Sequence, residues 1–130
     1  MSSKIGFPDY FKIIFNIESL VQKGEQKTIN DSVAGSEKTI YVAPEGKIAY
    51  LYLIFASAIN TNPSLPGEAA VKLTSGARTT NLMPLILGPN FVIPFSILPA
   101  FIKLMPNDSI AISTNRTDVR LNTTIYVVEM

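Results

Sequence analysis

The amino-acid sequence predicts an all-β protein, a two-sheet antiparallel β-sandwich that is jelly-roll-like and follows an N-terminal arm. Short runs of β-branched and aromatic residues recur about every ten residues between Gly, Pro, Asn and Asp, which is typical of such sandwiches. Segment 81–105 carries one charge, Lys103, and prolines at every fifth residue exclude a helix there, because each internal proline costs about 3 kcal/mol. An uninterrupted apolar helix that could span a membrane is therefore not expected. The four prolines are Pro84, Pro89, Pro94 and Pro99.

The composition indicates a single domain with an unusually uncharged surface. A chain of 130 residues buries one core. Charged residues make up 16% of the chain, against about 25% in typical domains, whereas the apolar share of 47% is ordinary. Eleven basic and ten acidic residues give a net charge of +1, and neither sign clusters. Neither nucleic acid nor an anionic membrane surface is expected as a partner, since both require concentrated basic charge.

Histidine and cysteine are both absent. The usual zinc, haem, iron–sulfur and copper sites are therefore excluded, as are Ser-His-Asp and Cys-His nucleophilic centres. We expect no catalytic residues, no metal and no cofactor. Without cysteine there is no disulfide evidence for an oxidising compartment. Residues 1–8 include no apolar stretch of signal-peptide length, so export by that route is not expected.

The first 35 residues are expected to form an arm and a polar loop before a sandwich over residues 36–130. Residues 10–21 fit a strand, with Phe11, Ile13 and Phe15 on one face, and also fit an amphipathic helix. The strand is favoured, because β-branched and aromatic residues dominate. Residues 23–36 are polar and contain Gly and Asn-Asp-Ser, so they indicate a loop with at most a brief strand.

A hairpin is the strongest local signal in the chain. Strand 38–42 leads into a turn over residues 43–46, with Pro44 and Gly46 at favoured positions, and a long strand follows over residues 47–57. That strand is apolar on both faces, which predicts a place in the middle of a covered sheet. Residues 60–67 contain two prolines and are expected to form a wide presented loop.

The later part of the chain alternates strands and turns. The last strand is apolar enough to be expected inside a sheet and not at its edge. Turns are expected at residues 75–78, 106–108 and 115–118. The expected strands cover residues 69–74, 82–87, 90–93, 101–105, 109–114 and 119–129.

The proline-containing segment is expected to lie at a sheet rim. Prolines are tolerated at sheet edges, strand starts and bulges, where no ladder hydrogen bond is lost. A rim without charge is hard to explain if it faces only water, so we expect it to line a contact between copies of the protein. The predicted subunit-interface residues are Leu85, Ile86, Phe91, Ile93, Phe95, Leu98 and Phe101.

Three stretches of the sequence resemble small virion β-sandwich domains of tailed phages and related viruses. They are residues 39–47, where Pro44, Gly46 and Lys47 introduce a long apolar strand, residues 88–94, and residues 104–110, where a turn leads into Asp108, Ser109 and Ile110. The resemblance covers residues 38–130, and Asn107 stands where the pattern prefers Gly. It implies a capsid, decoration, spike or tail component that assembles as a symmetric oligomer, and it implies no catalytic residues.

Several polar features of the sequence suggest a function but also have simpler explanations. Asp108 and Asp118 would suit acid–base chemistry only if about 5 to 10 Å apart, and solvated turn residues are the preferred interpretation. With neighbouring Asn residues they also offer oxygen ligands for Ca²⁺, although no dense acidic loop exists. Tyr50 and Tyr52 are expected on one face of their strand and Phe55 on the other, and these rings suggest sugar stacking, but core or interface roles are commoner. Four Asn-X-Ser/Thr sequons, at Asn30, Asn107, Asn115 and Asn122, are interpreted as turn residues, and Arg78, Arg116 and Arg120 as a solvated face.

The function predicted from the sequence is that of a non-enzymatic virion structural or assembly protein acting through self-association. Its expected partners are further copies, in a homo-oligomer of cyclic symmetry, and other virion proteins. Its expected location is the virion, after production in the host cytoplasm. The alternative is a carbohydrate- or ligand-binding β-sandwich module using loops such as 60–67, and an enzyme is a distant third.

Overall fold

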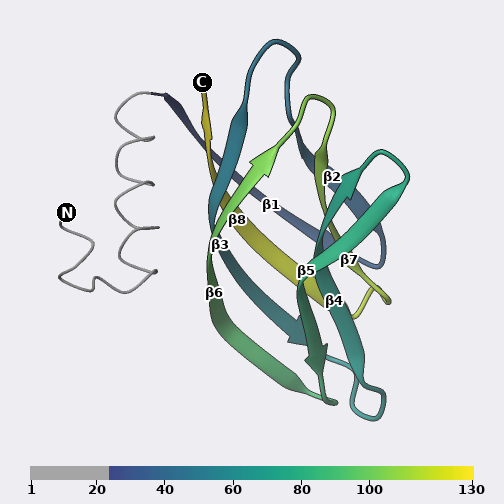
Figure 1. Ribbon diagram of the computed structural model, residues 1–130. Coiled ribbons are helices and arrows are strands. Elements are labelled where there is room, and N and C mark those ends of the chain that lie inside the picture. Colours follow the sequence, from purple (N-terminus) through teal and green to yellow (C-terminus); the bar gives the residue numbers. More distant parts are fainter. Residues whose placement is uncertain (1–23) are drawn as a thin grey trace, which may run out of the picture.

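The computed structural model describes residues 24–130, which fold into eight strands in two antiparallel four-stranded sheets packed face to face (Figure 1). The predicted fold class is confirmed. The sheets have the strand orders β1-β8-β3-β6 and β2-β7-β4-β5. The strands are β1 (Glu25–Ala34), β2 (Glu37–Val42), β3 (Ala49–Asn60), β4 (Gly67–Ser75), β5 (Arg78–Leu87), β6 (Phe91–Leu104), β7 (Ser109–Thr114) and β8 (Val119–Glu129).

The pairing of the strands is nested: strands near the two ends of the described chain pair with each other, and the pairs between them in the sequence do the same in turn. The first pairs with the last, β2 with β7, β3 with β6 and β4 with β5, all antiparallel. Such nested pairing is what results when one long antiparallel ribbon is rolled up into two sheets, and it is the topology of a jelly roll. The strand β8 lies between β1 and β3, so the predicted interior position of the last strand is confirmed.

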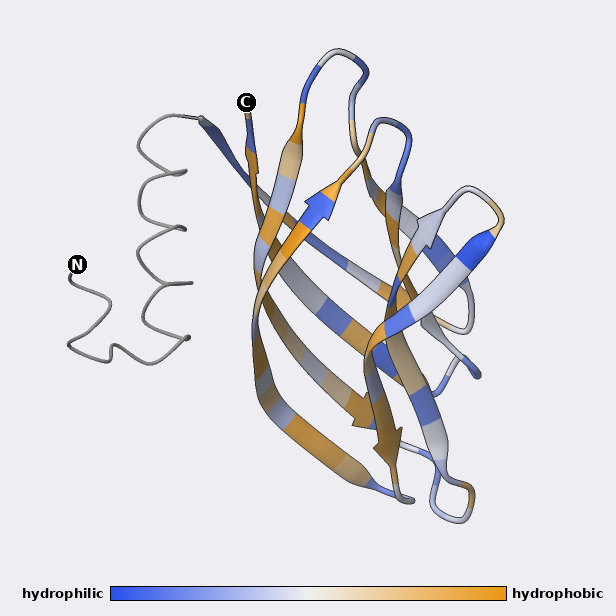
Figure 2. Ribbon diagram, viewed as in Figure 1, coloured by the Kyte–Doolittle hydropathy of each residue, from blue (hydrophilic) through white to orange (hydrophobic). Residues whose placement is uncertain are grey.

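The core lies between the two sheets and is built from inward-facing positions of all eight strands. Isoleucine, leucine, valine and alanine make up most of it, and Figure 2 shows apolar colour along strands of both sheets, the edge strand β6 included. Burying such a side chain stabilises the fold by about 1.5 to 3 kcal/mol. The largest fully buried side chains are Leu51, Ile54, Leu87, Leu104, Ile110, Ile112, Leu121, Ile125, Val71, Val119, Val127 and Val128.

The prediction of a loop with at most a brief strand over residues 23–36 is wrong, because residues 25–34 form β1, a strand of ten residues. Its register with β8 runs without interruption from Glu25 opposite Glu129 to Ala34 opposite Arg120. The sequence concealed this strand because β1 is an edge strand whose side chains are mostly exposed and polar, and only Val33 is buried. The segment 10–21 lies outside the described residues, and the division of the chain at residue 35 stays a prediction.

The hairpin expected between residues 38–42 and 47–57 is also wrong. The turn itself forms, with Gly46 at a φ of 77°, but β2 belongs to one sheet and β3 to the other. On the two sides of the turn, Ala43 donates its N–H to the carbonyl of Asp108 at 2.8 Å, and Ile48 donates to the carbonyl of Met130 at 3.2 Å. The connection therefore crosses between sheets. Turn chemistry in the sequence specifies the bend but not the partner of each strand.

The strand expectations for the rest of the chain are largely confirmed, with one difference. Residues 90–93 and 101–105 are not separate strands but parts of β6, which runs for 14 residues through Pro94 and Pro99. The strand β6 is the edge of its sheet, and it tolerates these prolines because an edge strand has ladder bonds on one side only. In the part of the chain that the structure describes, no helix is long and apolar enough to cross a membrane.

Candidate interaction surface

The strands β5 and β6 form an open rim of the sandwich. Each is the last strand of its sheet on the same side of the molecule, and the two contact each other across the sandwich. Three prolines lie in these strands, Pro84 in β5 and Pro94 and Pro99 in β6, and Pro89 lies in the turn between them. The predicted position of the proline-containing segment at a sheet edge is confirmed.

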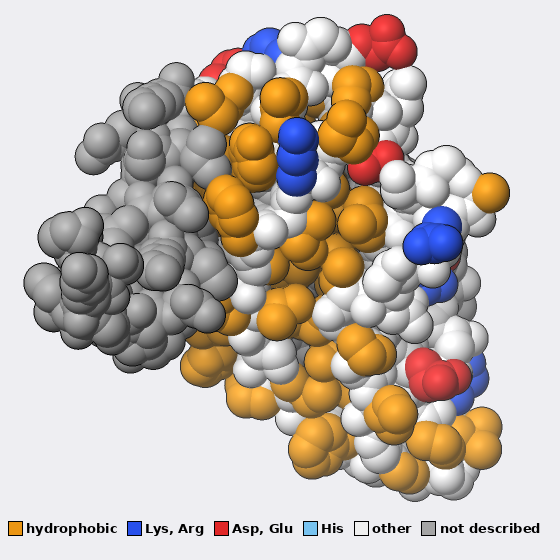
Figure 3. Space-filling model, viewed as in Figure 1, with side chains coloured by type: hydrophobic (Ala, Val, Ile, Leu, Met, Phe, Trp, Pro, Cys, Tyr) orange, Lys and Arg blue, Asp and Glu red, His pale blue; other side chains and the backbone are white. Residues whose placement is uncertain are grey.

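The rim exposes large apolar side chains. Half of the twelve large hydrophobic residues that are exposed in residues 24–130 lie on β5 and β6. Figure 3 shows such side chains spread over this face with few charges among them. The strand β6 carries one charged residue, Lys103. The exposed rim residues, with the exposed fraction of each, are Ile86 (76%), Phe95 (66%), Phe91 (51%), Val92 (51%), Ile97 (46%) and Phe101 (36%).

The seven predicted interface residues fall into two groups. Ile86, Phe91, Phe95 and Phe101 are exposed on the rim. The remaining residues, Leu85, Ile93 and Leu98, are partly buried and pack against the core. Members of the second group therefore hold the edge strands on the sandwich. Whether the exposed group contacts another copy stays a prediction.

Sequence reasoning missed Val92 and Ile97 as exposed members of the rim. Their neighbours in the sequence alternate as strand residues do, but the alternation in β6 is broken twice, at register shifts opposite Tyr52 and Ser57 of β3. Adding one residue to a strand turns the side chains that follow to the other face. Prolines lie near these shifts, but they do not specify which residue is added to the strand, so the exposed set emerges only from the pairing.

An aromatic cluster continues the rim across the outer face of β3 and β8. Tyr50 stacks on Phe101 with ring centroids 5.2 Å apart, and Tyr126 of β8 packs 6.1 Å from Tyr52 and 5.9 Å from Phe55. Burial, with a smaller effect of Tyr126, raises the pKa of the Tyr52 hydroxyl. Such ring pairs contribute about 0.5 to 1.5 kcal/mol beyond the area that they bury.

The sequence assignment of Phe55 to the face opposite Tyr52 is wrong. Against β8, Leu51 pairs with Val127 and Leu53 with Tyr126, so β3 carries one extra residue at Tyr52. After this bulge the alternation is reversed, because Leu51 and Ile54 both point into the core. Phe55 consequently lies on the outer face together with Tyr52.

Two hollows mark the outer faces of the sheets. One of about 180 Å³ lies beside the rim, between Phe55 and Phe95 on one side and Asn122 and Thr124 on the other. The second, of about 510 Å³, lies open on the outer face of the other sheet, where Lys72 pairs with Glu37 at 3.0 Å. Only the first combines aromatic rings with amide and hydroxyl groups.

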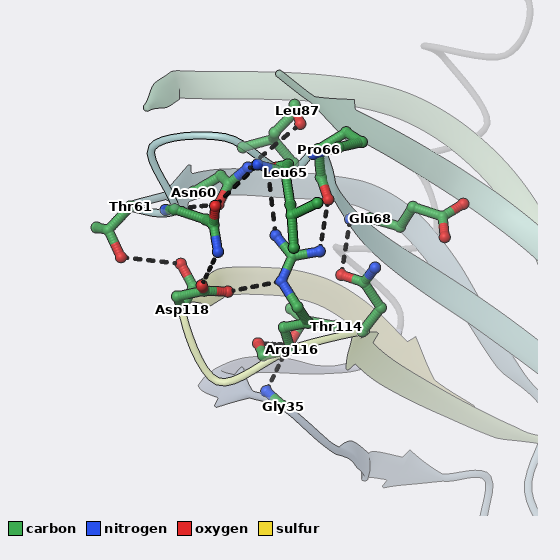
Figure 4. A network of polar contacts seen from close by, with 12 residues as sticks. Gly35, Asn60, Thr61, Leu65, Pro66, Glu68, Leu87, Thr114, Arg116 and Asp118 are labelled. Carbon is green, nitrogen blue, oxygen red and sulfur yellow. Dashed lines mark hydrogen bonds and ion pairs between the residues drawn. The ribbon is translucent and has the colours of Figure 1, made fainter. Parts of the chain in front are cut away.

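The loop between β3 and β4 is fixed to the turn between β7 and β8 by a polar network (Figure 4). The guanidinium of Arg116 donates to the carbonyls of Pro66 at 2.6 Å and Leu65 at 3.3 Å, and pairs with Asp118 at 3.0 Å. The side chain of Asn60, 1% exposed, donates to the carbonyl of Leu65 at 2.8 Å and to that of Gly88 at 3.0 Å. Arg116 thus acts as a clamp, a side chain that joins the loop between β3 and β4 to the turn between β7 and β8, and its interpretation as part of a solvated face is wrong.

The two carboxylates considered for acid–base chemistry do not form a pair. Asp108 precedes β7 and Asp118 follows it, so a strand of six residues, about 20 Å long, separates them. Asp108 is 7% exposed, so its interpretation as a solvated turn residue is wrong, and it closes a turn by accepting a hydrogen bond from the N–H of Met105 at 2.9 Å. The hydrogen bond from Asn62 and the ion pair with Arg116 lower the pKa of Asp118 despite its desolvation. Within residues 24–130 no three acidic side chains gather at a possible metal site.

The sequons divide between turns and strands. Asn107 and Asn115 lie in turns, as interpreted from the sequence, and Asn107 has the positive φ of 72° that glycine or asparagine tolerates. Asn30 and Asn122 instead lie within β1 and β8, so their interpretation as turn residues is wrong. Asn30 donates a hydrogen bond to the hydroxyl of Thr124 on the neighbouring strand.

A buried carboxylate lies at the end of the sandwich where β8 finishes. Glu129 is 3% exposed and accepts a hydrogen bond from the hydroxyl of Tyr41 at 2.6 Å. Its second oxygen lies 3.3 Å from the ammonium of Lys27 and 3.7 Å from that of Lys47. Burial raises the pKa of Glu129, but the bond from Tyr41 and the two lysines outweigh it and lower the pKa. Burial and the adjacent carboxylate raise the pKa of Tyr41, so its hydroxyl stays a donor.

Comparisons with known proteins identify the fold and no family. No protein-family model and no curated protein matches the chain. A pentameric capsid protein isolated from metagenomic phage sequences matches 75% of the chain at 20% identity and a TM-score of 0.50, and the chain covers 58% of that protein's length. Eiger TNF from S. frugiperda matches 82% at 10% identity and a TM-score of 0.51, with 92% of its own length covered. Murine APRIL matches 80% of the chain at 12% identity and a TM-score of 0.53, with 99% of its own length covered.

The resemblance to virion β-sandwich domains is therefore confirmed at the level of the fold, since a phage capsid protein shares it. The same fold serves a TNF as well. A fold hosts many functions, so the function has to be argued from the surface that this chain presents.

Proposed function

We propose that the protein is a non-enzymatic virion structural component that assembles with copies of itself through the rim formed by β5 and β6. One observation carries this proposal: six large apolar side chains are exposed along two edge strands that have almost no charge between residues 81 and 105. Contiguous apolar surface on a soluble protein usually marks an interaction site, because leaving it in water is unfavourable.

The fold comparison supports a virion as the setting. A capsid protein from phage sequences with this fold is described as pentameric, and a ring of that kind repeats one contact around a cyclic axis. By analogy we propose a cyclic homo-oligomer that docks with other virion proteins after production in the host cytoplasm. The proposed component is a capsid, decoration, spike or tail protein.

The test is the mass of the full-length protein by size-exclusion chromatography with light scattering. Phe91→Asp and Phe95→Asp place a charge on the rim and are expected to reduce an oligomer to a monomer at micromolar concentration. Val42→Asp is the matched control, because Val42 is 52% exposed, as Phe91 is 51%, but lies on β2, away from the rim. The control variant is expected to keep the mass of the unsubstituted protein.

Two outcomes would contradict the proposal. One is an unsubstituted protein that stays monomeric at micromolar concentration, and the other is an oligomer whose mass is unchanged in both rim variants. Circular dichroism of each variant establishes that it is folded, so a loss of assembly is distinguished from a loss of structure.

A second candidate function is carbohydrate binding, and the hollow beside Phe55 is the observation that favours it. Its aromatic and amide groups are the kind that stack on a sugar and bind its hydroxyls. The loop 60–67 favours it less, because Asn60 and Asn62 are engaged in the network with Arg116 and Asp118. A glycan array would decide: binding that Phe55→Ala abolishes supports this candidate, and no binding removes it.

A further inference from the structure

The two edge strands of the rim are irregular at their prolines. In β6 the register with β3 shifts between Ser96 and Ile93, where Pro94 lies, and again between Pro99 and Ile102. In β5 the register with β4 shifts between Asn81 and Met83, next to Pro84. Each proline within a rim strand therefore lies at or beside a break in the ladder.

These breaks limit what the free edges can bind. An added antiparallel strand requires N–H and C=O groups that alternate at a regular spacing of two residues. Between its two register shifts, β6 offers a regular run of four residues, 96–99, and that run ends in proline, which has no N–H. Short regular runs, bulges and prolines are the devices by which natural sheets prevent pairing at an edge.

The side chains of the same strands, in contrast to their backbone, favour contact with another protein surface. Ile86 and Phe95 are the two most exposed large apolar residues of the described chain, Ile97 on the same rim is 46% exposed, and no ion pair covers them. The rim thus combines a backbone that resists strand addition with side chains that favour association.

We infer that copies of this protein meet through the apolar side chains of the rim, and that neither sheet continues past β5 or β6 into a neighbouring copy by strand addition. The occupant of the surface is a second copy, so the inference rests on the proposed self-association. The prolines at positions 84, 94 and 99 then have a specific role, which is to keep two long edge strands from pairing without limit.

The test replaces the prolines of the two edge strands, so that these positions gain the backbone N–H donors that proline lacks. In the full-length protein the triple variant Pro84→Thr, Pro94→Thr, Pro99→Thr supplies three N–H groups and a residue that favours strands. We expect the starting oligomer to form as before and then to grow into larger assemblies that scatter light and bind thioflavin T. Pro89→Thr is the matched control, because Pro89 lies in the turn between β5 and β6 and its replacement is expected to cause no growth.

Hydrogen exchange resolved by residue gives the second readout. Strand addition would slow exchange at alternate amides of β6 by a factor of about ten or more in the oligomer relative to Phe95→Asp, because those amides would gain hydrogen bonds. The inference expects no such alternation. It is overturned if alternate protection is seen, or if the triple variant neither grows nor binds thioflavin T. A monomeric unsubstituted protein would instead refute the proposed function, and the triple variant would still decide whether the prolines protect the edges.

Discussion

At the scale of single residues, Glu129 shows how the fold stabilises a buried carboxylate in its charged form. The carboxylate has lost most of its water, and Tyr41, Lys27 and Lys47 replace that water with one hydrogen bond and two nearby positive charges. Breaking a buried arrangement of this kind is costly, because the remaining groups stay desolvated without a partner. The residue ties β8 to β1 and to the loop before β3.

Stability is therefore expected to fall in acid. The pKa of Glu129 is lowered from its ordinary value of 4.5, so its contribution is fully present above that pH and is lost as the pH falls through the lowered folded-state pKa. Glu129→Gln is expected to reduce the free energy of unfolding at pH 7 by about 1 to 3 kcal/mol and to weaken the dependence on pH between about 5 and 2. Urea unfolding across that range measures both.

Glu68→Gln is the control for this prediction, because Glu68 is exposed and forms no ion pair with the described residues. It is expected to follow the unsubstituted protein. A Glu129→Gln variant with an unchanged pH profile would show that the buried carboxylate does not stabilise the fold.

Gly67 is a second residue whose role depends on close contact. A Cβ added there would lie 2.5 Å from a methyl carbon of Val119 and 3.3 Å from the amide of Asn60, both buried. Gly67→Ala is expected to lower the free energy of unfolding by about 1 to 3 kcal/mol, since the packed neighbours have to move. Gly88→Ala, where nothing lies within 4 Å, is expected to change it by about 0.5 kcal/mol or less. Equal effects in thermal unfolding would contradict the close approach.

At the scale of the element, β3 shows why strand alternation misleads. The bulge at Tyr52 places Ile54 in the core, whereas uninterrupted alternation from Leu51 would turn it outwards. Ile54→Ala is expected to cost about 2 to 5 kcal/mol. Ile48→Ala, at a site 40% exposed, is expected to cost about 1 kcal/mol or less. Chemical denaturation that found the two variants equally stable would place Ile54 outside the core.

The sequence predicted those elements whose signals are local. Turn residues and apolar runs located β4, β7 and β8 well, and the prolines identified edge strands. The strand β1 was missed because its outward side chains are polar, and the hairpin between β2 and β3 was wrong because a turn does not specify a sheet. The Arg116 clamp was missed as well, since its carbonyl partners lie 50 and 51 residues away along the chain.

At the scale of the whole molecule, the proposed assembly should be insensitive to salt. Between residues 81 and 105 the rim has one charged side chain, Lys103, so ionic attraction contributes little to a contact made there. Raising the ionic strength from about 0.05 M to about 1 M shortens the screening length to about 3 Å and would dissociate a charge-driven complex. Light scattering is expected to give the same mass at both extremes. Dissociation at high salt would place the contact on a charged surface instead.

The sequence predicted the sandwich, its jelly-roll character and the rim, because strand number, turn spacing and proline positions are all visible in one chain. Which side chains the rim exposes was predictable only in part. Ile86, Phe91, Phe95 and Phe101 were identified, whereas Leu85, Ile93 and Leu98 face inwards to the core and Val92 and Ile97 were missed. The difference arises from register shifts, which depend on pairing between strands distant in the sequence.

The nested pairing of the strands also determines when the chain is able to fold. The pair β4–β5 is local, joined by the turn at Gly76, but β8 has to insert between β1 and β3, whose first residues, Glu25 and Ala49, both pair with Glu129, 104 and 80 positions further along the chain. Contacts between residues so distant form late and slowly, on a scale of milliseconds to seconds. On the ribosome, β1 and β3 therefore remain without their shared neighbour until β8 has been synthesised, and until then the nascent chain exposes the strand edges that β8 later covers.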